Sequence, residues 1–146
     1  MLFRSNNNLA GSNDELEVLA PINALFDECG RLKNFAMLKD IQLDIPEFSS
    51  FSDLPPYNLK NYSETLTLEE LRFSSISDYQ YEILKPQIDI FENIAIAKFR
   101  LKQKGILVDN KSFTGKQIII NGRATFVLIK KESWKIIHFH LDQIPE

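Results

Sequence analysis

The stretch that decides the fold is GRATFVLIKKESWKIIHFH, residues 122–140. It predicts two strands, at residues 117–130 and 134–141, joined by a tight charged turn at residues 131–133. Side chains two apart on a strand point to the same face of a sheet. One face of the last strand should therefore carry Trp134, Ile136, His138 and His140. The opposite face should carry Ile137, Phe139 and Leu141.

Upstream of this hairpin, the chain changes from a helical to a strand-like pattern. Apolar spacing predicts helices at residues 18–29, 34–41 and 67–73, with a short strand at residues 48–52. Alternation with a period of two then predicts strands at residues 79–90 and 94–104. Helices followed by meandering strands indicate an α+β domain, in which a strongly curved antiparallel sheet wraps around the N-terminal helices.

Composition limits the class of protein. The chain has 146 residues, of which 44% are hydrophobic, so it is long enough for one compact domain and too apolar for intrinsic disorder. The net charge of −3 argues against a nucleic-acid partner. Cys29 is the single cysteine, which excludes internal disulfides and cysteine-based zinc clusters. We expect residues 1–12 to form a flexible arm and residues 13–146 to form a single domain.

The N-terminus carries no recognisable targeting segment. Its first ten residues, MLFRSNNNLA, lack the apolar run of a signal peptide. No stretch approaches the length of a membrane span. These features predict a cytoplasmic protein with no membrane partner.

The C-terminal hairpin carries a family resemblance. Its hydrophobic strand, short charged turn and Trp-Lys-x-x-His-x-His sequence from Trp134 resemble the last hairpin of SnoaL-like proteins. These proteins belong to the nuclear-transport-factor-two-like superfamily, with the ketosteroid isomerases and the association domain of calmodulin-dependent kinase II. The stretch IAKFRLKQ, residues 96–103, also resembles the preceding strand of that association domain. The resemblance implies a cystatin-like α+β cone with a pocket at its open end, and a homodimer formed through the outer face of the sheet.

The resemblance also suggests residues that bind a small molecule. Arg100 matches a pocket arginine of the association domain, and a guanidinium there would suit a carboxylate or other anion. The alternative is that Arg100 belongs to a solvated basic stripe with Lys98 and Lys102. Two further pocket arginines of that domain are replaced here by Phe126 and Leu141, which implies a more apolar pocket. The expected lining is Ala124, Phe126, Leu128, Ile137 and Phe139, with Tyr57 nearby as a ligand contact.

The histidines of the last strand fit an interface better than a metal site. His138 and His140 could supply two metal ligands, but the chain has no third histidine and no acid at a telling spacing. We therefore predict no metal and no cofactor. Trp134, His138, His140 and Arg123 are the predicted interface residues, with catalysis by the histidine pair as the remaining alternative.

One acidic residue could act as a general base. Ketosteroid isomerases use an aspartate placed after their helical hairpin, and Asp53 lies in roughly that region, close in sequence to Tyr57 and Tyr62. An aspartate before Leu-Pro-Pro is also an ordinary turn residue.

Three functions stay open. The first is a pocket that binds a small apolar or weakly acidic metabolite. The second is an isomerase or polyketide-cyclase-like enzyme that transfers a proton on a carbonyl substrate, and the third is a homo-oligomeric assembly domain.

Overall fold

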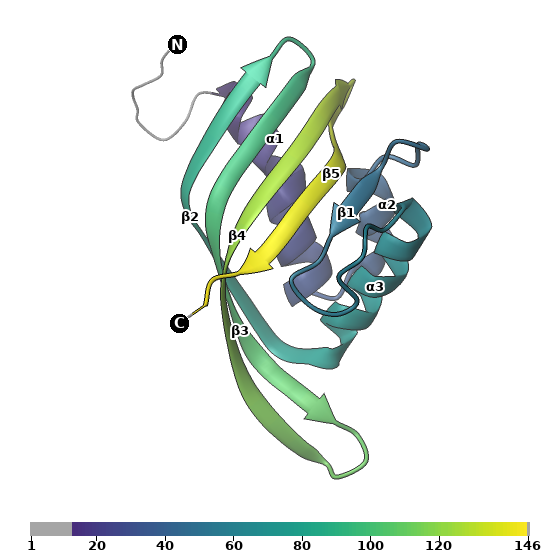
Figure 1. Ribbon diagram of the computed structural model, residues 1–146, viewed down its shortest axis with the longest axis vertical. Helices are drawn as coiled ribbons and strands as arrows, with labels where there is room; N and C mark the ends of the chain where they lie inside the picture. The colour runs from purple at the N-terminus through teal and green to yellow at the C-terminus, as the bar shows by residue number, and fades with distance from the viewer. Residues whose placement is uncertain (1–12, 146) are drawn as a thin grey trace.

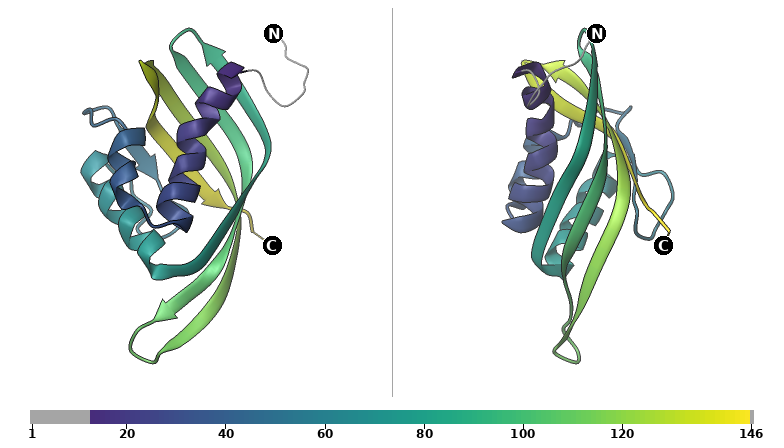
Figure 2. Two further views of the ribbon diagram at one scale, coloured as in Figure 1. Left: turned by 180° about the vertical axis from the view of Figure 1, so that it is seen from behind. Right: turned by 90° about the vertical axis from the view of Figure 1, so that its left-hand side faces the viewer.

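The computed structural model describes residues 13–145. A five-stranded sheet in the order β1-β5-β4-β3-β2 curves around a layer of helices, and the helices cover only its concave face (Figures 1 and 2). This arrangement confirms the predicted α+β cone. The predicted arm, residues 1–12, lies outside the described part of the chain.

The N-terminal helix lies along the concave face of the sheet. Helix α1 (Asn13–Ala24) runs on directly into the wider π-helical turns of η1 (Leu25–Arg31), and Pro21 lies inside α1 without ending it. Gly30 is required at the end of η1 because a Cβ there would stand 2.8 Å from Cε2 of Tyr79. Its role is thus a close approach between helix and sheet. Within residues 13–145, no helix is long and apolar enough to cross a bilayer.

The middle of the chain forms the second wall of the helical layer. A 3-10 turn, η2 (Phe35–Met37), leads into the short helix α2 (Leu38–Ile41), and strand β1 (Ser49–Phe51) follows. Helix α3 (Tyr62–Ser75) begins earlier than the predicted residue 67. The reason is a capping box: the Asn61 side chain accepts from the Glu64 N–H, and the Glu64 carboxylate accepts from the Asn61 N–H.

Three long strands and one shorter strand form the rest of the sheet. They are β2 (Ile76–Phe91), β3 (Ile94–Asp109), β4 (Thr114–Lys131) and β5 (Ser133–Gln143), each paired antiparallel with the next. Strand β1 joins β5 in parallel, so the sheet is mixed. The ends of β3 and β4 (residues 105–118) extend beyond β5 as an arm, with which only the first residues of β2 pair (Figure 1). Gly105, which lies just after the predicted strand at residues 94–104, instead continues β3 and pairs with Ile118.

A β-bulge in β5 changes which residues face the core. Val127 pairs with His138, but the adjacent Leu128 pairs with Ile136, so Ile137 is an extra residue. The bulge reverses the alternation on its N-terminal side, and Trp134 is only 6% exposed within the core. The prediction that Trp134 shares an outer face with His138 is therefore wrong. The one-residue insertion is the physical reason.

Candidate functional site

A cavity of about 540 Å³ lies between helix α3, the segment around residues 50–60, and the β3–β4 arm. A volume of this size is typical of small-molecule sites. Most of its wall is apolar, and the side chains that form it include Leu68, Leu71, Ile76, Leu107, Ile118 and Phe139. Glu69 and Arg72 of α3 are the charged groups at its inner side, so an apolar space ends on a small polar cluster.

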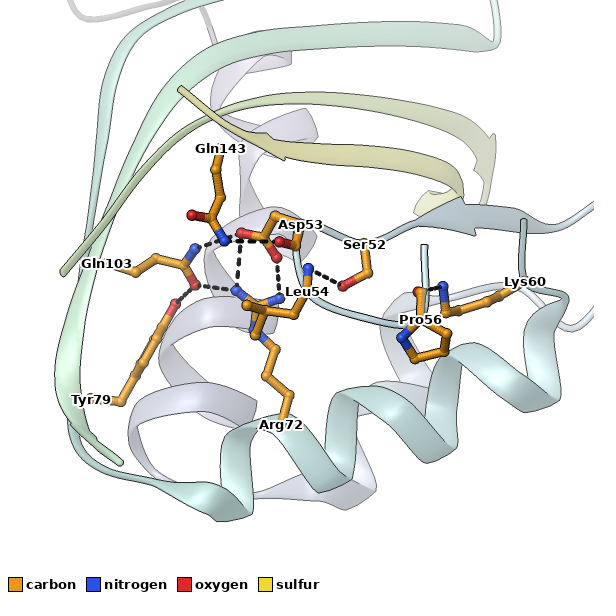
Figure 3. Close-up of polar contacts among 9 residues, drawn as sticks. All are labelled: Ser52, Asp53, Leu54, Pro56, Lys60, Arg72, Tyr79, Gln103 and Gln143. Carbon is orange, nitrogen blue, oxygen red and sulfur yellow. Dashed lines mark hydrogen bonds and ion pairs between the residues drawn. The ribbon is translucent and has the colours of Figure 1, made fainter. Parts of the chain in front are cut away.

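A buried ion pair forms the centre of that polar cluster (Figure 3). Arg72 Nη1 donates to Asp53 Oδ1 at 2.5 Å, and Arg72 Nη2 donates to Asp53 Oδ2 at 3.3 Å. The side chains are only 9% and 1% exposed, respectively. The fork geometry pairs one full positive charge with one full negative charge away from water.

Polar side chains from three other elements complete this cluster, as Figure 3 shows. Arg72 Nη2 and the Tyr79 hydroxyl both donate to Gln103 Oε1, at 3.0 Å and 2.7 Å. Gln143 Nε2 donates to the backbone carbonyl of Asp53 at 2.9 Å. These contacts hold the loop that carries Asp53 against β3 and β5, and they fix the guanidinium of Arg72.

One donor of this cluster remains unsatisfied. Arg72 Nε is buried and has no hydrogen-bond partner among the described residues. Buried donors are almost always paired in folded proteins, so an unpaired one marks strain or a missing partner. The unpaired Nε belongs to a side chain that lines the cavity.

Glu69 is the acid that lines the cavity. It is 7% exposed and lies on the buried face of α3, four residues after Thr65 and four before Phe73. Burial raises the pKa of the Glu69 carboxyl to about 7, with the Asp53 charge adding to this rise and Arg72 opposing it. A carboxyl that titrates near neutral pH beside an apolar cavity is suited to proton transfer or to proton-linked binding.

Two buried groups near Glu69 are kept neutral by the same environment. Burial, together with the charge of Glu69, raises the pKa of the Cys29 thiol to about 12. Burial also raises the pKa of the Tyr79 phenol above its usual range. Neither group supplies a nucleophile at neutral pH, because the reactive form of each is its anion.

Polar groups at the other end of the cavity are already paired. Ser50 Oγ and Thr65 Oγ1 share a hydrogen bond of 2.7 Å. The Lys60 ammonium donates to the backbone carbonyl of Pro56, as Figure 3 shows. It also donates to the backbone carbonyl of Asn58 at 2.8 Å. Lys60 therefore closes its own loop and does not present a free cation to the cavity.

The structure places the predicted base, Asp53, in the polar cluster but engages it fully. Both carboxylate oxygens accept hydrogen bonds from Arg72. Asp53 therefore serves as the counter-ion of Arg72. Tyr57 does not line this cavity. It is 64% exposed and borders a separate, more polar hollow with Phe51 and His140.

The assignment of Arg100 to the pocket is wrong. Phe99 and Leu101 face the core, so the alternation of β3 places Arg100 on the outer face, where it is exposed and pairs in register with Arg123. The core side of the strand also carries Ala95 and Ala97, both fully buried. Their small size suits a sheet face on which a helix packs closely. Arg100 therefore joins Lys98 and Lys102 in the basic stripe that was the alternative.

Phe126 and Phe139 have different roles. Phe126 is fully buried, with ring centroids 5.7 Å from Phe99 and 5.2 Å from Phe139. It is a core residue beneath the cavity, so its assignment as a ligand contact is wrong. Phe139 lines the cavity, and its role in ligand binding stays a prediction.

The remaining predicted interface residues lie on the outer face of the sheet. His138 accepts or donates a 2.8 Å hydrogen bond with Ser49 Oγ, and burial lowers the pKa of His138. The ring of His140 lies 5.2 Å from that of Phe51, and Arg123 forms a two-pronged ion pair with Asp142. Their participation in a subunit interface stays a prediction. Within residues 13–145, no cluster of three or more His, Cys, Asp or Glu could hold a metal ion.

Sequence reasoning missed Glu69, Arg72 and Gln103 as site residues. A usable signal existed for the first, because Thr65, Glu69 and Phe73 recur every four residues and so share one helical face. The capping box at Asn61 and Glu64 would have shown where the helix begins, and therefore that all three residues lie in it. Arg72 and Gln103 carry no comparable local signal, since their partners are 19 to 50 residues away.

Comparisons with known proteins identify the fold. Neither a protein-family model nor a curated protein matches the chain. Among solved structures, it is similar to a Nuclear transport factor 2 (NTF2-like) superfamily protein from Salmonella enterica serovar Typhimurium, with a TM-score of 0.76 and 18% identity, over 92% of this chain and 95% of that one.

Two further structures carry functional names. A proposed ketosteroid isomerase from Shewanella frigidimarina aligns with a TM-score of 0.62 and 19% identity, over 86% of this chain and 94% of that one. A proposed calcium/calmodulin-dependent protein kinase II association domain from Xanthomonas campestris aligns with a TM-score of 0.66 and 19% identity, over 100% and 99%. The chain thus has the NTF2-like fold, and the predicted resemblance is confirmed. A fold that carries such different functions does not choose among them.

Proposed function

We propose that this protein binds a small, mostly apolar metabolite in the cavity between α3 and the β3–β4 arm. The observation that carries this proposal is a cavity of about 540 Å³ whose apolar wall ends on Glu69 and Arg72. Apolar pockets with a few convergent polar groups are the usual form of small-molecule sites. A weakly acidic ligand loses the support it had from Arg100, because that residue lies on the outer face.

A pair of neighbouring serines at the end of α3 allows a controlled test. Ser75 lines the cavity, whereas Ser74 is exposed, and both hydroxyls donate to the Leu71 carbonyl. A bulky side chain at residue 75 should occupy the cavity, and the same side chain at residue 74 should project into solvent. Each variant therefore loses one hydrogen bond to the same Leu71 carbonyl, and the two differ in whether the cavity is blocked.

Titration calorimetry with 2-acetylnaphthalene, an apolar bicyclic ketone, measures the effect. We expect Ser75→Phe to weaken binding by about tenfold or more, which corresponds to a loss of about 1.4 kcal/mol. Ser74→Phe should bind like the unmodified protein. Equal binding by both variants would place the ligand elsewhere and contradict the proposal.

A second candidate function is proton transfer on a carbonyl compound, and the cavity-lining Glu69 favours it. In this reaction the Glu69 carboxylate would accept a proton from the carbon next to the carbonyl, and the C–H electron pair would move to form an enolate. Return of a proton to carbon would regenerate the carboxylate. Asp53 is the weaker candidate base, because Arg72 engages both of its oxygens.

Deuterium exchange tests this second candidate. The methyl protons of 2-acetylnaphthalene in D₂O should exchange faster with the protein than without it, as followed by NMR. Glu69→Gln should remove about 10²–10⁴-fold of any such acceleration, the usual contribution of a general base. Exchange that is unaffected by the protein would dismiss the enzyme, and exchange that is unaffected by the substitution would dismiss Glu69.

Self-association through the outer face accompanies the binding proposal. The similarity to association domains supports it, and an assembly domain remains the third functional candidate. Val127 is half-buried on this face and pairs in register with His138. We expect sedimentation at pH 8 to show a dimer that Val127→Asp dissociates. A shift to pH 5, which favours the charged form of His138, should loosen the dimer. A monomer at both pH values would refute this interface.

A further inference from the structure

Two polar groups at the inner side of the cavity have no partner. The Glu69 carboxyl makes no side-chain hydrogen bond within the described residues, and the influences on its pKa are burial and the charges of Arg72 and Asp53. Arg72 Nε is buried and unpaired three residues further along the same helix. Both belong to side chains that line the cavity, so a ligand that enters it meets them.

The buried cations at the inner side of the cavity are already paired, and Lys116, on the exposed β3–β4 arm, is the other cation that lines it. The guanidinium of Arg72 is neutralised by Asp53 through two contacts. The Lys60 ammonium is turned to the carbonyls of its own loop. Bringing a carboxylate into an apolar space without a compensating charge is costly, and the nearby Glu69 would add repulsion whenever it is ionised.

The Glu69 carboxyl and Arg72 Nε would both be satisfied by a hydrogen-bond acceptor on the ligand. When protonated, Glu69 offers one O–H, and Arg72 offers its Nε–H, so the polar end of the cavity holds two donors without an acceptor. A carbonyl oxygen has two lone pairs and no charge, which matches this arrangement. An ammonium group would add a third donor beside the Arg72 cation.

We infer that the cavity selects an uncharged ligand with an acceptor oxygen, such as a ketone, ester or amide, over the carboxylate or amine of the same skeleton. The neutral carboxyl of Glu69 donates to that oxygen, and ligand binding takes up a proton above neutral pH. This inference rests on the proposed binding function and names the ligand class for the same site.

The proton linkage has a definite size. Burial raises the pKa of Glu69 to about 7, so the donor form dominates at pH 6 and is a minor fraction at pH 8. If only that form binds, the apparent Kd rises about tenfold between these pH values. The charged groups that face Glu69 are Arg72 and Asp53, which are paired with each other.

Two buried neutral groups near the site have pKa values that burial moves away from this range. Burial is the largest cause of both shifts. It raises the pKa of the Cys29 thiol, in η1, to about 12. It raises the pKa of the Tyr79 phenol, in β2, above its usual range. Lys60 and Lys116 also line the cavity. His138 and His140 lie on the other face of the sheet, beside Ser49 and Phe51.

Three probes with one skeleton separate the ligand classes. We would titrate 2-acetylnaphthalene, 2-naphthoate and 2-(aminomethyl)naphthalene into the full chain at pH 6 and pH 8 by calorimetry. Glu69→Gln keeps a neutral donor of similar shape without a titrating proton. Glu70→Gln is the matched control, because Glu70 is the exposed neighbour on the same helix.

The ketone should bind most tightly at pH 6 and about tenfold more weakly at pH 8. Glu69→Gln should bind it equally at both pH values, and Glu70→Gln should behave like the unmodified protein. Heats measured at pH 8 in two buffers of different ionisation enthalpy should show uptake of a proton, which tests the inference in the unmodified protein alone.

Several outcomes would overturn the inference. A carboxylate or amine that binds more tightly than the ketone, a ketone affinity that is independent of pH, or a pH effect that persists in Glu69→Gln would each do so while leaving the binding function intact. Absence of binding by all three probes would overturn the binding function, and this inference with it.

Discussion

Replacing Asp53 with Asn isolates the contribution of the buried ion pair. The side chains of Asp53 and Arg72 are 1% and 9% exposed. The Arg72 cation would keep the 3.0 Å contact with Gln103 but lose the carboxylate to which it is hydrogen-bonded. Breaking a buried pair from one side typically costs about 3–5 kcal/mol, since an uncompensated charge remains away from water. We expect Asp53→Asn to lower the free energy of unfolding by this amount.

Urea denaturation measures this loss against a matched control. With a slope of about 2 kcal/mol per molar urea, typical for a small domain, the midpoint should fall by about 2 M. The control is Asp142→Asn. Asp142 receives two equal contacts of 3.0 Å from Arg123, but the two side chains are 37% and 64% exposed. Solvent screens such pairs, so the control should hardly move the midpoint.

A double substitution tests the electrostatic explanation itself. Adding Arg72→Met to Asp53→Asn removes the stranded charge and should recover part of the lost stability, because an apolar replacement of a buried pair is often neutral. If the two substitutions instead add their costs, or if Asp53→Asn is no more harmful than Asp142→Asn, the reasoning from burial is refuted.

Three further predictions concern packing and pH. Phe126→Ala removes a fully buried ring and should cost about 3–5 kcal/mol in the same urea assay; a cost below 1 kcal/mol would contradict its place in the core. Gly122→Ala would bring a Cβ within 2.2 Å of the Asp142 carbonyl and should lower the melting temperature clearly more than Gly115→Ala, whose Cβ meets only a side-chain methyl group; equal effects would contradict the register of β4 and β5. Because burial raises the pKa of Glu69 from 4.5 to about 7, the folded state binds this proton more tightly than the unfolded chain. Stability should therefore be highest below about pH 4.5 for this group and fall as the pH rises to about 7, and Glu69→Gln should flatten that interval in chemical unfolding series.

The candidate site was only partly accessible to prediction. Asp53 was placed near the pocket by its position after the helical segments, and it lies in the polar cluster beside the cavity. Its engagement by Arg72 depends on a contact between residues 19 apart, on different elements, which no local pattern encodes. Arg100 was assigned to the wrong face, although the large apolar neighbours on either side indicated that the core lies opposite it.

The sequence by itself determined the class of fold, because periodicity is a local property. Alternation with a period of two marked the long strands, and the hydrophobic hairpin at residues 117–141 predicted the antiparallel pairing of β4 with β5. The tertiary structure alone decided which residues meet. One inserted residue, Ile137, turned Trp134 from the outer face to the core, and the curvature of the sheet brought Asp53 and Gln103 to Arg72. A bulge and a long-range ion pair depend on how the whole domain packs. A short stretch of sequence therefore cannot predict either of them.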